Sequence, residues 1–143
     1  MKKLFLLALL ILCPQLALAQ STFNASSQIA VKSFIAAANT TPVVIKANSG
    51  TVYSIDAFNN SGAIVYLKLY NQTSTGVVCG TTTPYARYLI PFGASSAGGG
   101  FNLSNINGDS YFQSITACVT TGIADNDTGA PTASTVIVNV HYQ

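Results

Sequence analysis

Charged side chains are scarce in this chain. Only 7% of its 143 residues are charged, with six Lys or Arg against four acids. Two of the basic residues, Lys2 and Lys3, lie in an N-terminal segment that we expect to be removed, which leaves a nearly neutral chain. Nucleic-acid binding and electrostatic docking on anionic lipid both need clustered Lys and Arg. The composition therefore argues against both, and the length suits one domain.

Side chains for catalysis are equally few. All four acids are aspartates, Trp is absent, and His141 is the single histidine. A Ser-His-Asp arrangement needs a base that an acid orients in a pocket, whereas His141 lies near the C-terminus on a strand face expected to be wet. The closest acids, Asp125 and Asp127, share one loop, although glycosidase carboxylates flank a cleft. We therefore expect no enzymatic activity, no catalytic residues and no cofactor.

The first twenty residues, MKKLFLLALLILCPQLALAQ, have the anatomy of a secretory signal peptide. A short basic region precedes an apolar run over 4–12, and Ala17-Leu18-Ala19 is a small-x-small cleavage signal. The run is shorter than the ~20 residues of a spanning helix, which disfavours a membrane anchor. Lipidation at Cys13 is a further alternative, disfavoured by the bulky residue before it. We predict a signal peptide over 1–19, no membrane insertion after cleavage, and a secreted, periplasmic or cell-surface location.

Two cysteines, Cys79 and Cys118, follow the predicted signal peptide. In an oxidising compartment such a pair is expected to form a disulfide. The alternation of the sequence places Cys118 on the polar face of a strand and Cys79 in an earlier loop, so the bridge should staple that loop to the outside of a sheet. Two distant cysteines and one histidine do not make a zinc site, and no metal is expected there.

A hydrophobic period of two dominates the rest of the chain. Aliphatic and polar residues alternate in AIVYLKLY, QSITACVTT and TVIVNVHY, which is typical of strands with one dry and one wet face. PVVIKA, TVYSIDAF and YARYLI indicate three more strands, and Asn- and Gly-containing turns are expected around Gly50, Gly62 and Gly108. The sequence predicts an all-β fold over 42–143, a single antiparallel β-sandwich or jelly-roll-like domain.

The segment 20–41 precedes this domain. Its stretch SQIAVKSFIAAA fits an edge strand, a short helix or an ordered arm. We treat 20–41 as an N-terminal segment or arm, with the hypothesis that it pairs with the sheet edge of a neighbouring molecule by strand addition.

Four residues are candidates for interaction. Tyr66, Tyr70 and Tyr88 fall on strand faces expected to point outward, where tyrosines stack on sugars or join protein interfaces. Ordinary cross-strand packing explains them at least as well. Lys68, between Tyr66 and Tyr70, is most simply a solvated charge that opposes strand-to-strand aggregation.

The loop sequence ADNDTG carries a possible metal site. Asp125 and Asp127, with their spacing to Gly129, match part of a calcium loop, in which oxygen ligands alternate along a turn. The complete pattern needs another acidic ligand downstream, and APTAST supplies none. A turn whose Asp and Asn cap their own backbone is the preferred interpretation, with Asp125 and Asp127 kept as a calcium candidate.

Several motifs carry a resemblance to a known family. They are YLKLYN at 66–71, CGTTTP at 79–84, LIPFG at 89–93, TTGIADNDT at 120–128 and VIVNVHY at 136–142. In this order and spacing they resemble a small all-β domain of tailed-bacteriophage virion proteins, over roughly Pro42 to Gln143. Two departures are the export signal and the cysteine pair, neither of which is usual in that family.

The resemblance implies a structural or accessory role on a particle surface, without catalysis. We therefore expect a secreted, non-enzymatic structural or interaction domain, a component of a surface assembly or virion-like particle. Its partner is expected to be protein, by self-association or within a larger assembly. The alternative is a carbohydrate-binding or adhesion module with a glycan partner, which a weakly charged, tyrosine-bearing surface permits and the lack of Trp disfavours.

Overall fold

The chain folds into two antiparallel β-sheets. The computed structural model describes residues 28–37, 40–93 and 98–143. The predicted signal peptide over 1–19 lies outside the described residues. In the part that is described, no helix has the length and hydrophobicity to cross a membrane.

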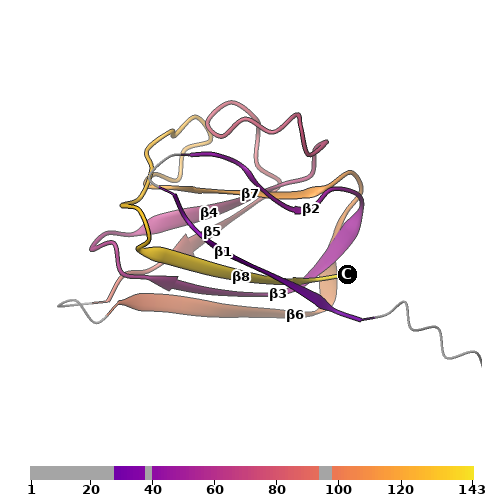
Figure 1. Ribbon diagram of the computed structural model, residues 1–143, viewed down its shortest axis with the longest axis horizontal. Coiled ribbons are helices and arrows are strands. Elements are labelled where there is room, and N and C mark those ends of the chain that lie inside the picture. The colour runs from indigo at the N-terminus through magenta and orange to yellow at the C-terminus, as the bar shows by residue number, and fades with distance from the viewer. Residues whose placement is uncertain (1–27, 38–39, 94–97) are drawn as a thin grey trace, which may run out of the picture.

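Within the described ranges, each sheet contains four strands. Sheet A has the spatial order β1 (Ala30–Ile35), β8 (Val136–Tyr142), β3 (Gly50–Asn59) and β6 (Gly99–Tyr111). Sheet B has the order β2 (Val43–Lys46), β7 (Ile115–Thr120), β4 (Val65–Tyr70) and β5 (Ala86–Ile90). Neighbouring strands are antiparallel throughout, and Figure 1 shows the two sheets as stacked layers. The predicted all-β sandwich is confirmed.

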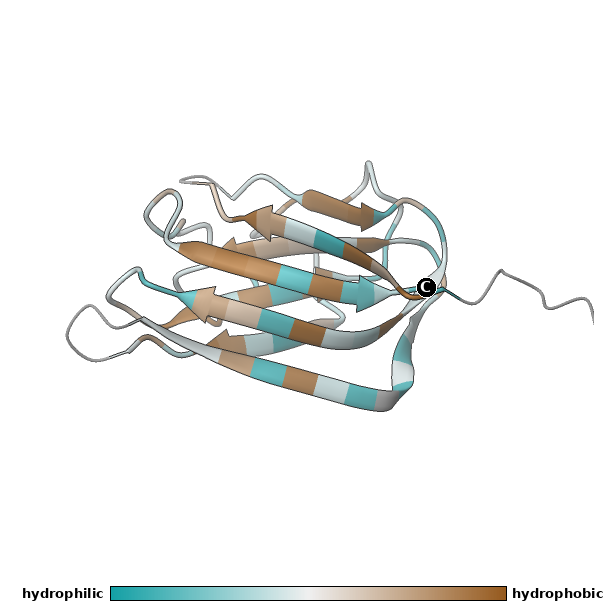
Figure 2. Ribbon diagram, turned by 60° about the horizontal axis from the view of Figure 1, so that its bottom comes forward, coloured by the Kyte–Doolittle hydropathy of each residue, from teal (hydrophilic) through white to brown (hydrophobic). Residues whose placement is uncertain are grey.

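The aliphatic faces of the strands meet between the two sheets. Hydrophobic and hydrophilic residues alternate along the strands of sheet A, as Figure 2 shows, because successive side chains of a strand point to opposite faces. The alternation predicted for β4, β7 and β8 is confirmed on the side that faces the core. The buried aliphatic residues of the core include Val52, Ile55, Val65, Leu67, Leu69, Ile90, Ile115, Ala117, Val119, Val136, Val138 and Val140.

The predicted N-terminal arm contributes a strand to its own sheet. β1 pairs antiparallel with β8 of the same chain, from Ala30 opposite Tyr142 to Ile35 opposite Ile137. Of the three interpretations of SQIAVKSFIAAA, the edge strand is the one found. Within its own chain this stretch is therefore the edge of sheet A, and its pairing with a neighbouring molecule stays a prediction. Residues 20–27 and 38–39 of the segment lie outside the described part of the chain.

One predicted turn is an irregularity within a strand. The register of β3 with β6 passes from Ser54 opposite Ser104 to Val52 opposite Asp109, so β6 carries extra residues at this point. Gly108 has φ of 70°, which glycine adopts readily, and a Cβ there would meet the side chain of Thr51. The chain therefore bulges around Gly108 and continues in the same strand, where the sequence predicted a turn between strands.

A buried asparagine ties the two sheets together. Asn59, with no exposed surface, donates through Nδ2 to the carbonyl oxygens of Ala63 at 2.8 Å and Ile90 at 3.1 Å. Its Oδ1 accepts a hydrogen bond from the Ser61 amide at 2.9 Å. These bonds close the turn after β3 and join it to β5 of the other sheet.

Candidate functional site

The outer face of sheet B is covered by two loops, 71–85 and 121–135. Figure 1 shows them above β4, β5 and β7, on the side of sheet B that faces away from sheet A. Tyr66, Lys68 and Tyr70 do share the outward face of β4, as alternation predicted. Lys68 and Tyr70 nevertheless have no exposed surface, and Tyr66 is half-buried. The prediction that Lys68 and Tyr70 are exposed is wrong, because the loops fold back over this face.

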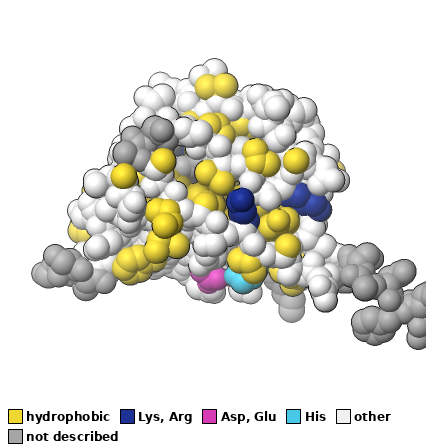
Figure 3. All heavy atoms as spheres, viewed as in Figure 1, with side chains coloured by type: hydrophobic (Ala, Val, Ile, Leu, Met, Phe, Trp, Pro, Cys, Tyr) yellow, Lys and Arg dark blue, Asp and Glu magenta, His cyan; other side chains and the backbone are white. Residues whose placement is uncertain are grey.

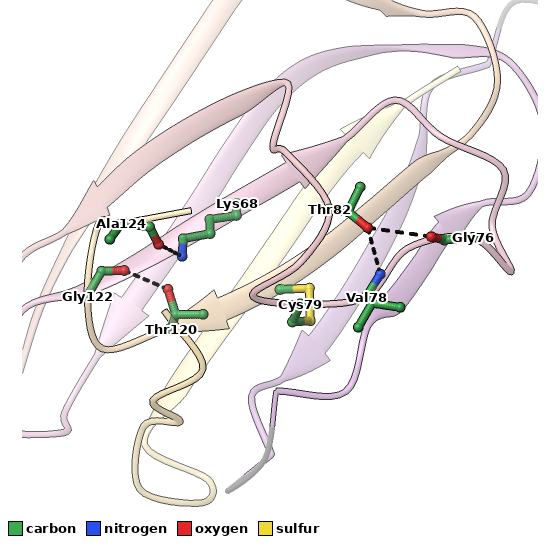
Figure 4. The surroundings of a disulfide bond; sticks show 9 residues. Lys68, Gly76, Val78, Cys79, Thr82, Thr120, Gly122 and Ala124 are labelled. Carbon is green, nitrogen blue, oxygen red and sulfur yellow. Dashed lines mark hydrogen bonds between the residues drawn. A yellow bond between two sulfur atoms is a disulfide. The ribbon is translucent and has the colours of Figure 1, made fainter. Parts of the chain in front are cut away.

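A disulfide fastens the first of these loops. Cys79 in the loop and Cys118 on β7 are bonded, with their Cα atoms 6.1 Å apart, and Figure 4 shows the bridge above the strand. The two cysteines are buried in a small cluster with Tyr70 and Val77. The predicted disulfide, with its loop stapled to the outside of a sheet, is confirmed. The cluster forms a second apolar centre on the far side of sheet B from the main core.

Two basic residues hold the second loop. The Nζ of Lys68 donates to the Ala124 carbonyl oxygen at 2.6 Å, a contact drawn in Figure 4. Burial lowers the pKa of Lys68 from its ordinary value, against the opposing effect of nearby Asp127 and Asp125. The Nε of Arg87 on β5 donates to Asp125 Oδ1 at 2.7 Å. Lys68 therefore anchors a covering loop and is not a solvated surface charge.

The calcium candidate residues serve other partners. Asp127 Oδ1 accepts hydrogen bonds from the amides of Gly122 at 3.1 Å and Gly129 at 3.0 Å. Asp125 is paired with Arg87, Nη2 to Oδ1 at 2.5 Å. Within the described ranges, no group of three or more His, Cys, Asp or Glu is placed to hold a metal ion. The geometry of this loop is that of a turn capped by its own aspartate.

Tyr88 faces inward. It lies opposite Leu67 in the register of β5 with β4, so its ring points between the sheets and stacks on Phe101 of β6, with centroids 6.2 Å apart. Its hydroxyl donates to Asp109 Oδ2 at 3.3 Å, and burial, followed by Asp109, raises the pKa of Tyr88 to about 12. The prediction of an outward-facing Tyr88 is wrong, because the alternation of β5 has the opposite phase.

The outer face of sheet A, in contrast, has no covering loop over its described residues. An apolar row crosses three neighbouring strands in register, with Ile35 of β1, Ile137 of β8 and Phe58 of β3 exposed by 56%, 38% and 46%. This row was not among the residues predicted from the sequence to take part in an interaction. The alternation of residues could have predicted the row, because Ile137 and Phe58 are apolar residues on strand faces that are otherwise polar.

A polar row runs beside the apolar one. Asp56 of β3 lies opposite Asn139 of β8 and Asn102 of β6. His141 Nε2 is 3.0 Å from Asp56 Oδ2, and the Asn102 amide donates to Asp56 Oδ1. Figure 3 shows an acidic and a histidine side chain adjacent on a surface with few other charges. These contacts fix the orientation of the His141, Asp56 and Asn102 side chains on the outer face of sheet A.

The fold defines the class as an all-β protein with two packed antiparallel sheets. Neither a protein-family model nor a curated protein matches the chain. The resemblance to a bacteriophage virion domain therefore stays a prediction.

Proposed function

We propose that this chain is an exported, non-enzymatic structural domain that associates with copies of itself through the outer face of sheet A. The observation that carries the proposal is the apolar row of Ile35, Ile137 and Phe58. Single exposed aliphatic residues are normal on protein surfaces, but a contiguous row on a sheet face is typical of an interaction surface.

The structure of the two faces supports this choice. Sheet B has its outer face sealed by two loops, a disulfide and the contacts of Lys68 and Arg87. Sheet A leaves its outer face open, and its side chains stand on hydrogen-bonded strands that lose little freedom on binding. An apolar strip flanked by polar groups is the usual composition of a protein interface.

A second copy is the partner that this face fits. The same face on two molecules can meet about a two-fold axis, so that each apolar row packs against the other. The polar row contains a carboxylate, Asp56, and an imidazole, His141. When two copies meet face to face, Asp56 of each copy can therefore lie near His141 of the other, and the two carboxylates need not face each other. The resemblance to virion domains agrees with a role in a particle or surface assembly.

The test is the mass of the mature chain, 20–143, by light scattering, together with negative-stain imaging. Ile137→Lys places a charge in the centre of the row and should lower the mass towards that of one chain. Ile123→Lys is the matched control, because Ile123 is 59% exposed in the loop over sheet B. A monomeric wild-type protein, or equal effects of the two substitutions at unchanged melting temperature, would contradict the proposal.

A further inference from the structure

Three tyrosines gather at the edge of the sandwich where β5 and β6 are the outermost strands of their sheets. Tyr88 belongs to β5, Tyr111 ends β6, and Tyr85 immediately precedes β5. The Tyr85 amide donates to the Leu69 carbonyl oxygen at 2.8 Å, which fixes the backbone of Tyr85 to β4. We call these three residues, with Asp109 and Asn105 of β6, the tyrosine cluster.

One ring of the tyrosine cluster is presented to solvent on a rigid support. Tyr85 is 54% exposed, whereas Tyr111 is 1% exposed. Their ring centroids are 5.0 Å apart at an interplanar angle of 62°, an edge-to-face contact. Such a contact fixes the orientation of the exposed ring, so that Tyr85 offers a ready surface for stacking.

Hydrogen-bonding groups of the cluster gather around Asp109. Asp109 accepts from the Tyr88 hydroxyl at 3.3 Å and from Asn105 Nδ2 at 2.9 Å. Neither donor is cationic, and among the described residues Asp109 forms no ion pair. The bulge around Gly108 brings Asn105 and Asp109 together, and both side chains are half-buried.

The cluster also contains a polar atom without a partner. The Tyr111 hydroxyl is buried and makes no hydrogen bond in the described structure. Burial, followed by the nearby Tyr88, Asp109 and Tyr85 groups, raises the pKa of Tyr111. A buried hydroxyl without a partner costs free energy, and such exceptions need a structural or functional reason.

We infer that the tyrosine cluster binds a neutral saccharide, with Tyr85 stacked on the C–H face of one sugar ring and Asp109 with Asn105 bonded to its hydroxyls. A sugar ring has an apolar face and a polar rim, and the cluster contains one exposed aromatic ring together with a carboxylate and an amide. A quaternary ammonium ligand would need several exposed ring faces, and Tyr85 provides one. This site lies apart from the apolar row of sheet A and does not depend on self-association.

The test is an NMR titration of the mature, disulfide-bonded chain with cellotriose, maltotriose and the trimer of N-acetylglucosamine. At least one probe should bind with a millimolar dissociation constant and shift the resonances of Tyr85. Tyr85→Ala should weaken that binding by about tenfold or more, and Tyr85→Phe should restore most of it, because the stacking surface is retained. Asp109→Asn should weaken binding less, since an amide oxygen still accepts.

Tyr66→Ala is the matched control, because Tyr66 is a half-buried tyrosine on the outer face of sheet B. It should leave saccharide binding unchanged. The inference is overturned if none of the three probes binds, if Tyr66→Ala weakens binding as much as Tyr85→Ala, or if tetramethylammonium binds in place of the saccharides.

Discussion

Removing the disulfide should cost a large part of the stability of this domain. The bridge joins residues separated by 39 positions. For a closed loop of that length, the entropy lost by the unfolded chain corresponds to about 4 kcal/mol at 25 °C. A domain of this size typically has a free energy of unfolding of about 5–15 kcal/mol, so Cys79→Ala with Cys118→Ala should lower the melting temperature by roughly 10–20 °C.

The assay separates the cross-link from the packing of its sulfur atoms. Thermal and urea unfolding should be followed for the oxidised wild type, the wild type in dithiothreitol, and the double alanine variant. Reduction alone removes the cross-link and leaves both side chains in the cluster of Tyr70 and Val77. The double variant also loses the buried sulfur atoms, so it should be slightly less stable than the reduced wild type and should not respond to dithiothreitol.

Amide hydrogen exchange, measured residue by residue before and after reduction, gives a second test of the role of the disulfide. Because the bridge holds the loop over sheet B, amide exchange should accelerate in 76–82 on reduction and change little in β3 and β8. A loss of stability below about 1 kcal/mol, or equal acceleration across both sheets, would refute the reasoning that the disulfide acts on the covering loop.

Three further predictions concern buried polar groups. Lys68→Met should cost about 1–3 kcal/mol of the free energy of unfolding, because the Ala124 carbonyl oxygen loses the donor that anchors the covering loop; unchanged stability in urea unfolding would contradict this. Asp127→Ala should cost about 1–3 kcal/mol, since the amides of Gly122 and Gly129 lose their acceptor, while Asp127→Asn should retain most of the stability. The raised pKa of Tyr70 and of Tyr88, each about 12 against an ordinary 10.0, means that the unfolded chain loses these protons first. The contribution of the two tyrosines to the free energy of unfolding should therefore be fully present below pH 10 and fall from pH 10 to pH 12. The lowered pKa of Lys68 acts in the opposite direction and makes stability rise with pH below 10.5. Thermal melts that show no loss of stability above pH 10 would contradict the raised pKa values of Tyr70 and Tyr88.

Alternation predicted the core because it depends on local geometry alone. The faces of β4, β7 and β8 could be assigned from the sequence, since successive side chains of a strand point to opposite sides whatever the rest of the chain does. β6 was not predicted as a strand, although Phe101 and Leu103 alternate with polar residues there, because the Asn and Gly residues around Gly108 favour a turn. A bulge within a long strand and a turn between two strands share the same local composition.

The burial of the polar face of β4 could not be predicted in the same way. Alternation places Lys68 and Tyr70 on the side of β4 opposite the core. It does not predict whether a loop distant in the sequence packs over that side. Only the fold brings 71–85 and 121–135 over sheet B. The cysteine pair was the one sequence signal of this cover, because it predicted a loop stapled to a sheet. The same limit applies to the tyrosine cluster, whose members come from β5, β6 and the residue before β5.

Sedimentation of the oxidised mature chain over a dilution series tests the central claim most directly. The account predicts a species of more than one chain that dissociates reversibly on dilution and is weakened by Ile137→Lys, with an unchanged β-rich circular dichroism spectrum. A single-chain species at every concentration, in a folded and disulfide-bonded sample, would contradict the assignment of the outer face of sheet A as a self-association surface.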